Sequence, residues 1–151
     1  MGDVFGAYSI IDLEMAGSIK NANLILNTWA SNGVLEWFYF HLGLDFLFLI
    51  TYSVFLYFAC HTSALQLKSF PFLIYLGLVI GWIQPVAGLL DLAENYALIQ
   101  VLHRTTDEFW PQLANLCAVP KFAISLSGMA YCVLALTLST SAGLVSKLRR
   151  K

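Results

Sequence analysis

Charged side chains are scarce in this sequence: Asp, Glu, Lys and Arg together make up 11% of its 151 residues. A soluble globular domain carries about 25% of such residues, whereas 59% of this chain is hydrophobic. So large a deficit of charge excludes an ordinary soluble fold. We therefore expect one compact all-α domain that is embedded in a membrane.

Several motifs are missing as well, and each absence excludes a class of protein. No basic stripe runs along a polar face, which argues against nucleic acid as a partner. No HExxH or comparable ligand motif occurs, so no metal site is assigned, and the sequence names no cofactor. The three cysteines, Cys60, Cys117 and Cys132, form no CxxC pair. This argues against a thiol oxidoreductase, and we expect the cysteines to be small apolar packing residues.

Three long apolar segments are present, over residues 34–60, 70–102 and about 109–140. Each exceeds the roughly 20 residues that a helix needs to cross the hydrocarbon core of a membrane. Because the connections between them are short, neighbouring helices should be antiparallel. The sequence predicts an integral membrane up-down helical bundle over residues 34–144, followed by a basic tail over residues 145–151.

The N-terminal segment, residues 1–33, has a different pattern. It is compatible with an amphipathic helix, because apolar residues recur on one side and polar residues on the other. We expect this helix to lie at the membrane interface or to be re-entrant; a fourth span is the alternative. The apolar side holds Ile11, Met15, Ala22, Ile25 and Trp29, and the polar side holds Lys20, Asn23, Asn27 and Ser31.

Lysine and arginine are unevenly distributed between the two ends of the bundle. With three spans, Lys68 lies on the same side as the four basic residues of the tail, which makes five. The opposite side carries two, Lys20 and Arg104. The positive-inside rule then predicts a cytoplasmic C-terminus, and a bacterial inner membrane is the host we expect.

Ionisable residues within the apolar segments are the strongest functional signal. Counted along the predicted helices at about 1.5 Å per residue, they reach one layer, on the order of 10–18 Å below the boundary opposite the tail. Charge at this depth costs several kcal/mol and marks a candidate functional site. The residues of this layer are Asp45, Asp91, Glu94, Asn95 and Lys121.

Helical periodicity predicts that one face of each span turns towards the others. On the second span this face is small or polar throughout and begins with the GxxxG pair Gly77 and Gly81, a pattern typical of helix packing in membranes. The predicted faces are His41, Asp45, Phe48 and Tyr52; Gly77, Gly81, Gln84, Gly88, Asp91 and Asn95; and Lys121, Ser125, Gly128 and Cys132.

The predicted cluster contains more acid than base. Lys121 can pair with Asp91 or Asp45, but one lysine cannot neutralise every carboxylate, so the remainder must be protonated, hydrated, or bound to a cation or a partner's group. A neutral Glu94 that donates a hydrogen bond is one such arrangement. Glu14 either caps this cluster or is a solvated acid on the N-terminal helix. His41 is a further candidate residue, which together with Asp91 and Glu94 could bind an ion.

Two segments resemble those of known proteins. LGLDFLFLITY (residues 42–52) and LLDLAEN (residues 89–95) resemble spans of small bacterial polytopic membrane proteins that carry LDFLF-like and LDLxEN-like sequences. The resemblance covers about the middle third of the chain. It implies a bacterial membrane protein and no particular activity.

Three functional hypotheses follow from these features. The first is a non-catalytic membrane subunit or binding module whose buried cluster binds a cation, a proton or a lipid headgroup. The second is a proton- or cation-coupled transporter or channel protomer, which at this length must oligomerise to enclose a pathway. The third is an intramembrane lipid-modifying enzyme that uses Asp91, Glu94 and His41. The expected partners are the lipid bilayer and either further copies of the chain or a larger membrane complex.

Overall fold

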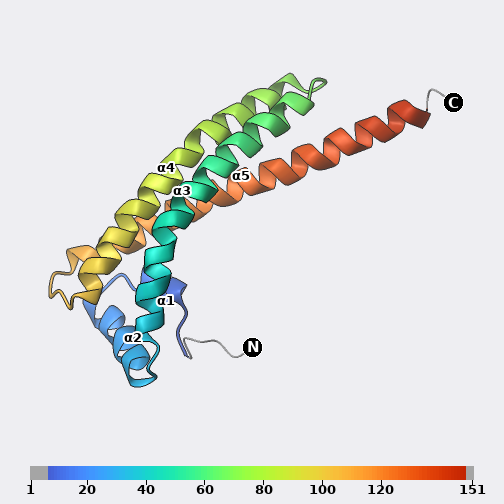
Figure 1. Ribbon diagram of the computed structural model, residues 1–151. Helices are drawn as coiled ribbons and strands as arrows, with labels where there is room; N and C mark the ends of the chain where they lie inside the picture. Colours follow the sequence, from blue (N-terminus) through green and yellow to red (C-terminus); the bar gives the residue numbers. More distant parts are fainter. Residues whose placement is uncertain (1–6, 149–151) are drawn as a thin grey trace. The chain divides into compact units, whose positions relative to one another are not determined.

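The computed structural model describes the backbone of residues 7–148 and the side chains of residues 7–141. Within this range the chain forms five helices and no strand (Figure 1). The helices are α1 (Ile10–Glu14), α2 (Ile19–Ser31), α3 (Leu35–Gln66), α4 (Pro71–Leu102) and α5 (Phe109–Leu148). The predicted all-α helical bundle is therefore confirmed. Residues 149–151 of the predicted basic tail, and all side chains of that tail, lie outside the described part.

Three helices are long and apolar enough to cross a membrane: Leu35–Gln66, Pro71–Leu102 and Phe109–Ser141. Each contains an 18-residue stretch whose mean hydropathy is 1.8, 1.9 and 1.8, in chain order. The first continues six residues beyond the predicted end at 60, and the second begins at Pro71, where a missing N–H costs no helical hydrogen bond. These helices are compatible with a membrane-embedded protein.

The N-terminal segment forms two helices instead of the single helix we expected. Gly17, with φ +64°, adopts the left-handed conformation between them, which glycine accepts without steric cost. Ser9 and Ser18 cap α1 and α2 with their side chains. Because α2 has 13 residues, it is about 20 Å long, which is too short for a span.

The break at Gly17 also changes which residues are buried. On α2, Ala22, Ile25 and Trp29 are buried as predicted. On the α1 side of the break, Ile11 and Met15 are exposed, and Leu13 is buried instead. A continuous helix would have kept one register through both parts. The left-handed glycine resets it.

The chain divides into two compact units, and each long helix contributes to both. Unit 1 comprises residues 1–50 and 88–121, so it contains α1, α2, the first half of α3, the second half of α4 and the start of α5. Unit 2 comprises residues 51–87 and 122–151, the remaining parts of α3, α4 and α5.

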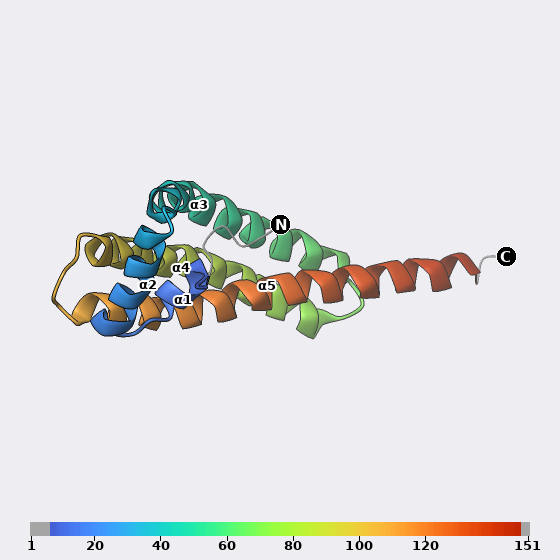
Figure 2. The same cartoon turned by 90° about the horizontal axis from the view of Figure 1, so that it is seen from below.

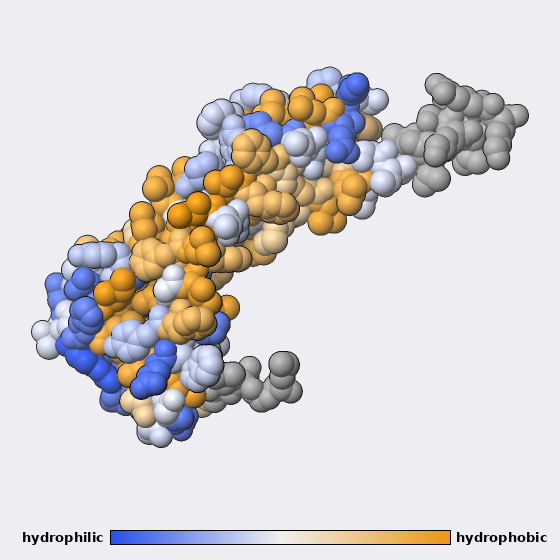
Figure 3. Space-filling view, viewed as in Figure 1, coloured by the Kyte–Doolittle hydropathy of each residue, from blue (hydrophilic) through white to orange (hydrophobic). Residues whose placement is uncertain are grey.

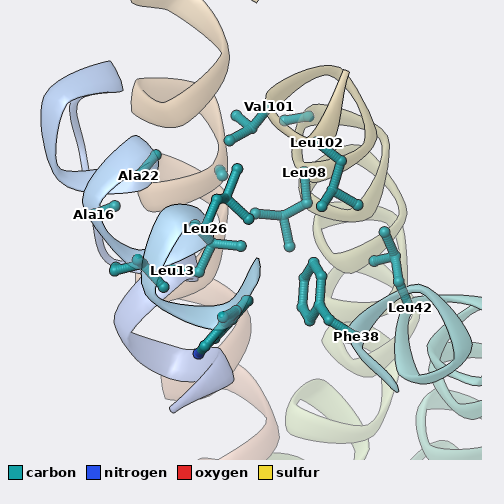
Figure 4. Packing of buried hydrophobic residues seen from close by; sticks show 13 residues of the cluster. Leu13, Ala16, Ala22, Leu26, Phe38, Leu42, Leu98, Val101 and Leu102 are labelled. Atoms are coloured by element: carbon teal, nitrogen blue, oxygen red, sulfur yellow. The ribbon is translucent and has the colours of Figure 1, made fainter. Parts of the chain in front are cut away.

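The core of unit 1 joins the two short helices to the ends of the long ones. Figure 4 shows Leu26 of α2 and Leu98 of α4 directed towards each other, with Phe38 of α3 beside them. Leu13 of α1 and Trp29 of α2 belong to the same cluster. Figure 2 shows the first turn of α2 near the start of α5, where the backbone N–H of Ile19 donates a hydrogen bond to Glu108. The N-terminal helices are therefore packed onto protein through their apolar sides.

The core of unit 2 depends on close approach between helices. Cys60 and Ala64 of α3 and Tyr131 and Ala135 of α5 are buried together. The Tyr131 hydroxyl donates a hydrogen bond of 2.9 Å to the carbonyl of Leu73 in α4. This hydrogen bond joins α4 to α5 at the core of unit 2.

The face predicted for the first span holds at Asp45, which accepts a hydrogen bond from Asn95 of α4, and is wrong at the exposed His41 and Phe48. Phe48 is 60% exposed and His41 is exposed, whereas Asp45 is half-buried. The buried positions of α3 include Phe38, Leu42, Leu49, Leu56, Cys60 and Ala64. The prediction followed the spacing of polar residues, whereas α3 packs mainly through its apolar side chains. Figure 3 shows hydrophobic side chains along the visible sides of the long helices, and hydrophilic ones over α2, over the α4–α5 connection and over the turn between α3 and α4.

Candidate functional site

Lys121 of α5 is at the centre of a buried ionic cluster in unit 1. Its Nζ donates to Asp91 Oδ1 and to Glu94 Oε1 of α4, each at 2.8 Å. The exposed fractions of Lys121, Asp91 and Glu94 are 6%, 3% and 0%. Ion pairs so far removed from water are weakly screened. These ion pairs join α4 to α5.

Helical spacing explains why one lysine reaches both carboxylates. Asp91 and Glu94 are three residues apart on α4, so their side chains lie on one face of the helix. Asn95 follows on the same face and donates from Nδ2 to Asp45 Oδ2 of α3 at 2.7 Å. Lys121 and Asn95 thus hold different acids. Of the two partners expected for Lys121, Asp91 forms the ion pair. Asp45 instead accepts a hydrogen bond from the side-chain amide of Asn95.

Glu14 of α1 is a fourth acid in this cluster. It is 8% exposed, and its Oε1 is 3.8 Å from Lys121 Nζ. Burial raises the pKa of Glu14 above its usual range; Lys121 opposes this shift, and the charges of Asp45 and Asp91 add to it. Glu14 is therefore a buried acid that covers the cluster, and not a solvated acid on the surface of the N-terminal helix.

The position of Glu14 depends on contacts made by its neighbours. The carbonyl of Met15 accepts a hydrogen bond of 3.2 Å from Asn115 Nδ2 of α5. Glu108 Oε2 accepts one of 2.8 Å from the backbone N–H of Ile19, at the first turn of α2. The carboxylate of Glu108, which lies just before α5, thus reaches the first residue of α2. Such contacts fix both ends of the Gly17 turn.

Arg104 adds a further contact between α2 and the end of α4. Its Nη1 donates to Asn23 Oδ1 at 3.2 Å and to Asn27 Oδ1 at 2.9 Å. Arg104 has φ +57°, a conformation that costs a residue with a Cβ about 1 kcal/mol or more. Hydrogen bonds to the polar side of α2 help to offset this cost. The predicted polar side of α2 therefore binds a loop.

The charges of the cluster do not balance. Glu14, Asp91 and Glu94 surround one lysine, and Asp45 lies nearby. Two carboxylates about 4 Å apart repel each other by roughly 4 kcal/mol at an effective dielectric constant of about 20. In addition, Glu14 Oε2 and Glu94 Oε2 are buried without a hydrogen-bond partner among the described residues. The cluster therefore holds more acidic groups and more buried acceptor atoms than its one lysine can satisfy.

His41 is exposed, whereas Asp91 and Glu94 are buried. It lies on the surface of α3 with its ring edge-on to that of Phe40. Among the described residues, no three His, Cys, Asp or Glu side chains are arranged to hold a metal ion. The geometry therefore gives no support to a ligand set of Asp91, Glu94 and His41.

The glycines of α4 allow side chains of neighbouring helices to approach the α4 backbone closely. A Cβ at Gly77 would overlap the phenol of Tyr131, and one at Gly81 would overlap the ring of His61. Gly88 is buried. Gly128 of α5 makes room for Gln84, whose Nε2 donates to the carbonyls of Ile80 and Ile124 at 3.1 and 3.2 Å. The stripe of small residues therefore sets how closely the helices approach.

Gln84 is a polar contact that sequence reasoning did not single out. It appeared only as one member of the face on α4. The structure adds that it bridges to α5 and that its Oε1 is buried without a partner among the described residues. Its position on a face that also holds Gly81 and Gly88 was the available signal.

No model of a known protein family matches the chain, and neither a curated protein nor a solved structure matches it. The resemblance of LGLDFLFLITY and LLDLAEN to bacterial membrane spans thus gains no support from these comparisons. Evidence on function comes from the buried cluster itself.

Proposed function

We propose that this chain is a non-catalytic integral membrane subunit or binding module whose buried cluster binds a small cation, the proton included. The single observation that carries the proposal is the convergence of Asp91, Glu94 and Glu14 on Lys121. These acids exceed the base in a region removed from water. A cation relieves their repulsion, whereas replacement by apolar residues would have avoided it altogether.

Burial favours a small cation over a lipid headgroup. The Glu94 side chain is fully covered, so a headgroup could reach it only if α1 or a neighbouring helix moved away. A proton or a small dehydrated ion needs far less room. The exposed position of His41 supports neither a metal centre nor the lipid-modifying enzyme.

We further propose that the C-terminus is cytoplasmic, that the host is a bacterial inner membrane, and that the bilayer and other protein copies cover the apolar sides of the long helices. Supporting this, α3 exposes large side chains such as Leu47, Phe55 and Phe58, with exposed fractions of 63%, 69% and 58%. Lipid alone can cover such a surface. A second copy or a larger complex can do so as well.

Native mass spectrometry from mild detergent tests this proposal, because it reports copies, partner proteins, lipids and ions together. We expect the wild-type chain in an assembly, and we expect cluster variants such as Glu94→Gln to change its proton or ion content. The exposed Glu36→Gln is the matched control. A monomer whose charge state and stability are the same in wild type and Glu94→Gln would contradict the proposal.

A transport assay separates the binding module from a transporter. In liposomes that contain the purified chain, a module gives no proton or cation flux above that of empty vesicles. A flux that disappears in Asp91→Asn would instead make the chain a transporter or channel protomer. It would also show that the cluster is a pathway and not a closed binding site.

A further inference from the structure

We propose that Glu14 and Glu94 share one proton, which makes the occupant of the cluster a proton and ties α1 to α4. This inference rests on the proposed function and specifies its ligand. The proton comes from water: an O–H bond forms on one carboxyl, and this group donates a hydrogen bond to the other, which stays ionised.

Geometry is the first support for the shared proton. The carboxyl groups of Glu14 and Glu94 come from different helices and meet at the ammonium of Lys121. Each also has one oxygen, Oε1, directed to Lys121 Nζ, at 3.8 Å for Glu14 and 2.8 Å for Glu94. This leaves Oε2 on both, buried and without a partner among the described residues. Two acceptors cannot satisfy each other, but one added proton satisfies both.

Charge is the second support. The groups that face the pair are Asp45 of α3, Asp91 of α4, and Lys121 and Cys117 of α5. Lys121 already binds Asp91 and Glu94 at 2.8 Å. One shared proton reduces the charge of Glu14, Asp91, Glu94 and Lys121 together from −2 to −1. It also removes the direct repulsion between Glu14 and Glu94.

The same geometry disfavours other cations. The ammonium of Lys121 occupies the centre of the carboxylates and would repel a metal ion placed there. Among the described residues there is also no group of three ligands for a metal. A proton needs no coordination sphere, because it binds a single carboxylate oxygen and needs only one further acceptor.

Infrared spectroscopy of the full-length chain in lipid nanodiscs tests the shared proton. We expect wild type at neutral pH to show the carbonyl band of a buried protonated carboxyl group, and this band to shift in deuterated water. The band should be lost in Glu14→Gln and in Glu94→Gln. In each variant the new amide N–H replaces the proton as donor, so the fold should survive. Glu36→Gln, at an exposed acid of α3, should retain the band.

Stability against pH provides a second readout with a defined sign. Because burial raises the pKa of Glu14 above its ordinary value of 4.5, the shared proton stabilises the fold fully below that value. The stabilisation is lost as pH rises through the folded-state pKa. Relative to Glu14→Gln, wild type should therefore become less stable from acid to alkaline pH, with faster amide exchange in α1.

Several results would overturn the shared proton. One is a wild type without the carboxyl band, and another is loss of the band in only one of the two glutamine variants. If the band is absent but wild type binds sodium from sodium chloride, and Glu94→Gln does not, the shared proton fails and the proposed cation-binding function stands. If wild type shows neither the carboxyl band nor sodium binding, both the shared proton and the proposed cation-binding function fail.

Discussion

Replacing Lys121 by methionine is the sharpest test of the buried cluster. The substitution keeps the length and apolar stem of the side chain but removes the ammonium that binds Asp91 and Glu94 at 2.8 Å each. Hydrogen bonds to charged groups contribute roughly 1.5–3 kcal/mol each, so two of them amount to about 3–6 kcal/mol. Removing one partner of a buried ion pair costs about 3–5 kcal/mol. We expect a loss in this range.

Thermal unfolding in detergent, followed by circular dichroism, measures the loss. For a chain of this size, 1 kcal/mol corresponds to a shift of roughly 2–4 °C in Tm. Lys121→Met should therefore unfold roughly 6–20 °C below wild type at neutral pH. The matched control is Lys20→Met, which removes an exposed lysine from α2 and should leave Tm almost unchanged.

Two further measurements identify the cause of the loss. The deficit of Lys121→Met should shrink at acid pH, because the carboxylates that lost their cation can then be protonated. The double variant Lys121→Met with Asp91→Asn should lose less than the two single variants added together, since both remove the same ion pair. A Lys121→Met chain as stable as wild type at neutral pH would refute the reasoning.

Two predictions concern unit 2. Gly77→Ala should destabilise the chain by about 1–3 kcal/mol, because the new Cβ overlaps the buried phenol of Tyr131 and overpacking costs about that much. Gly43→Ala, whose Cβ meets nothing within 4 Å, should be neutral or stabilising by up to about 1 kcal/mol; equal Tm values for the two variants would contradict this packing. Diamide should join Cys60 to Cys132, whose Sγ atoms are 3.7 Å apart, with loss of two hydrogens from the protein as diamide is reduced to its hydrazine. Intact mass should show the loss in wild type but not in Cys132→Ala, and an unreacted wild type would mean that α3 and α5 do not meet there.

Residue type and spacing carried much of the information about the cluster. Counting residues from the end of a predicted span gives the depth of each side chain, because the rise of an α-helix per residue is fixed. Asp91, Glu94 and Lys121 could therefore be assigned to one layer from the sequence. Their contact at 2.8 Å agrees with that count. Depth does not determine which way a helix faces, however. For α4 the glycines gave the direction, because small residues mark close approach. The predicted face of α3 has no such marker, and it was right at Asp45 but wrong at His41 and Phe48.

The N-terminal helices show the other limit of the sequence. Periodicity treated residues 4–31 as one helix, because a single glycine does not by itself end a helical pattern. In the structure Gly17 takes φ +64°, and the register of buried residues changes across it. That turn places Glu14 against Lys121, with the help of Asn115 and Glu108 from distant parts of the chain.

The sequence by itself determined the class of the protein, its three long apolar helices and the excess of acid over base at one depth. These depend on composition and on the fixed rise of an α-helix, which are local properties. The tertiary structure alone decided that Lys121 binds Asp91 and Glu94 together, that Asn95 holds Asp45, and that Glu14 closes the cluster while His41 is exposed. Those outcomes depend on how helices rotate and pack against one another, and packing is a property of surfaces distant in the chain.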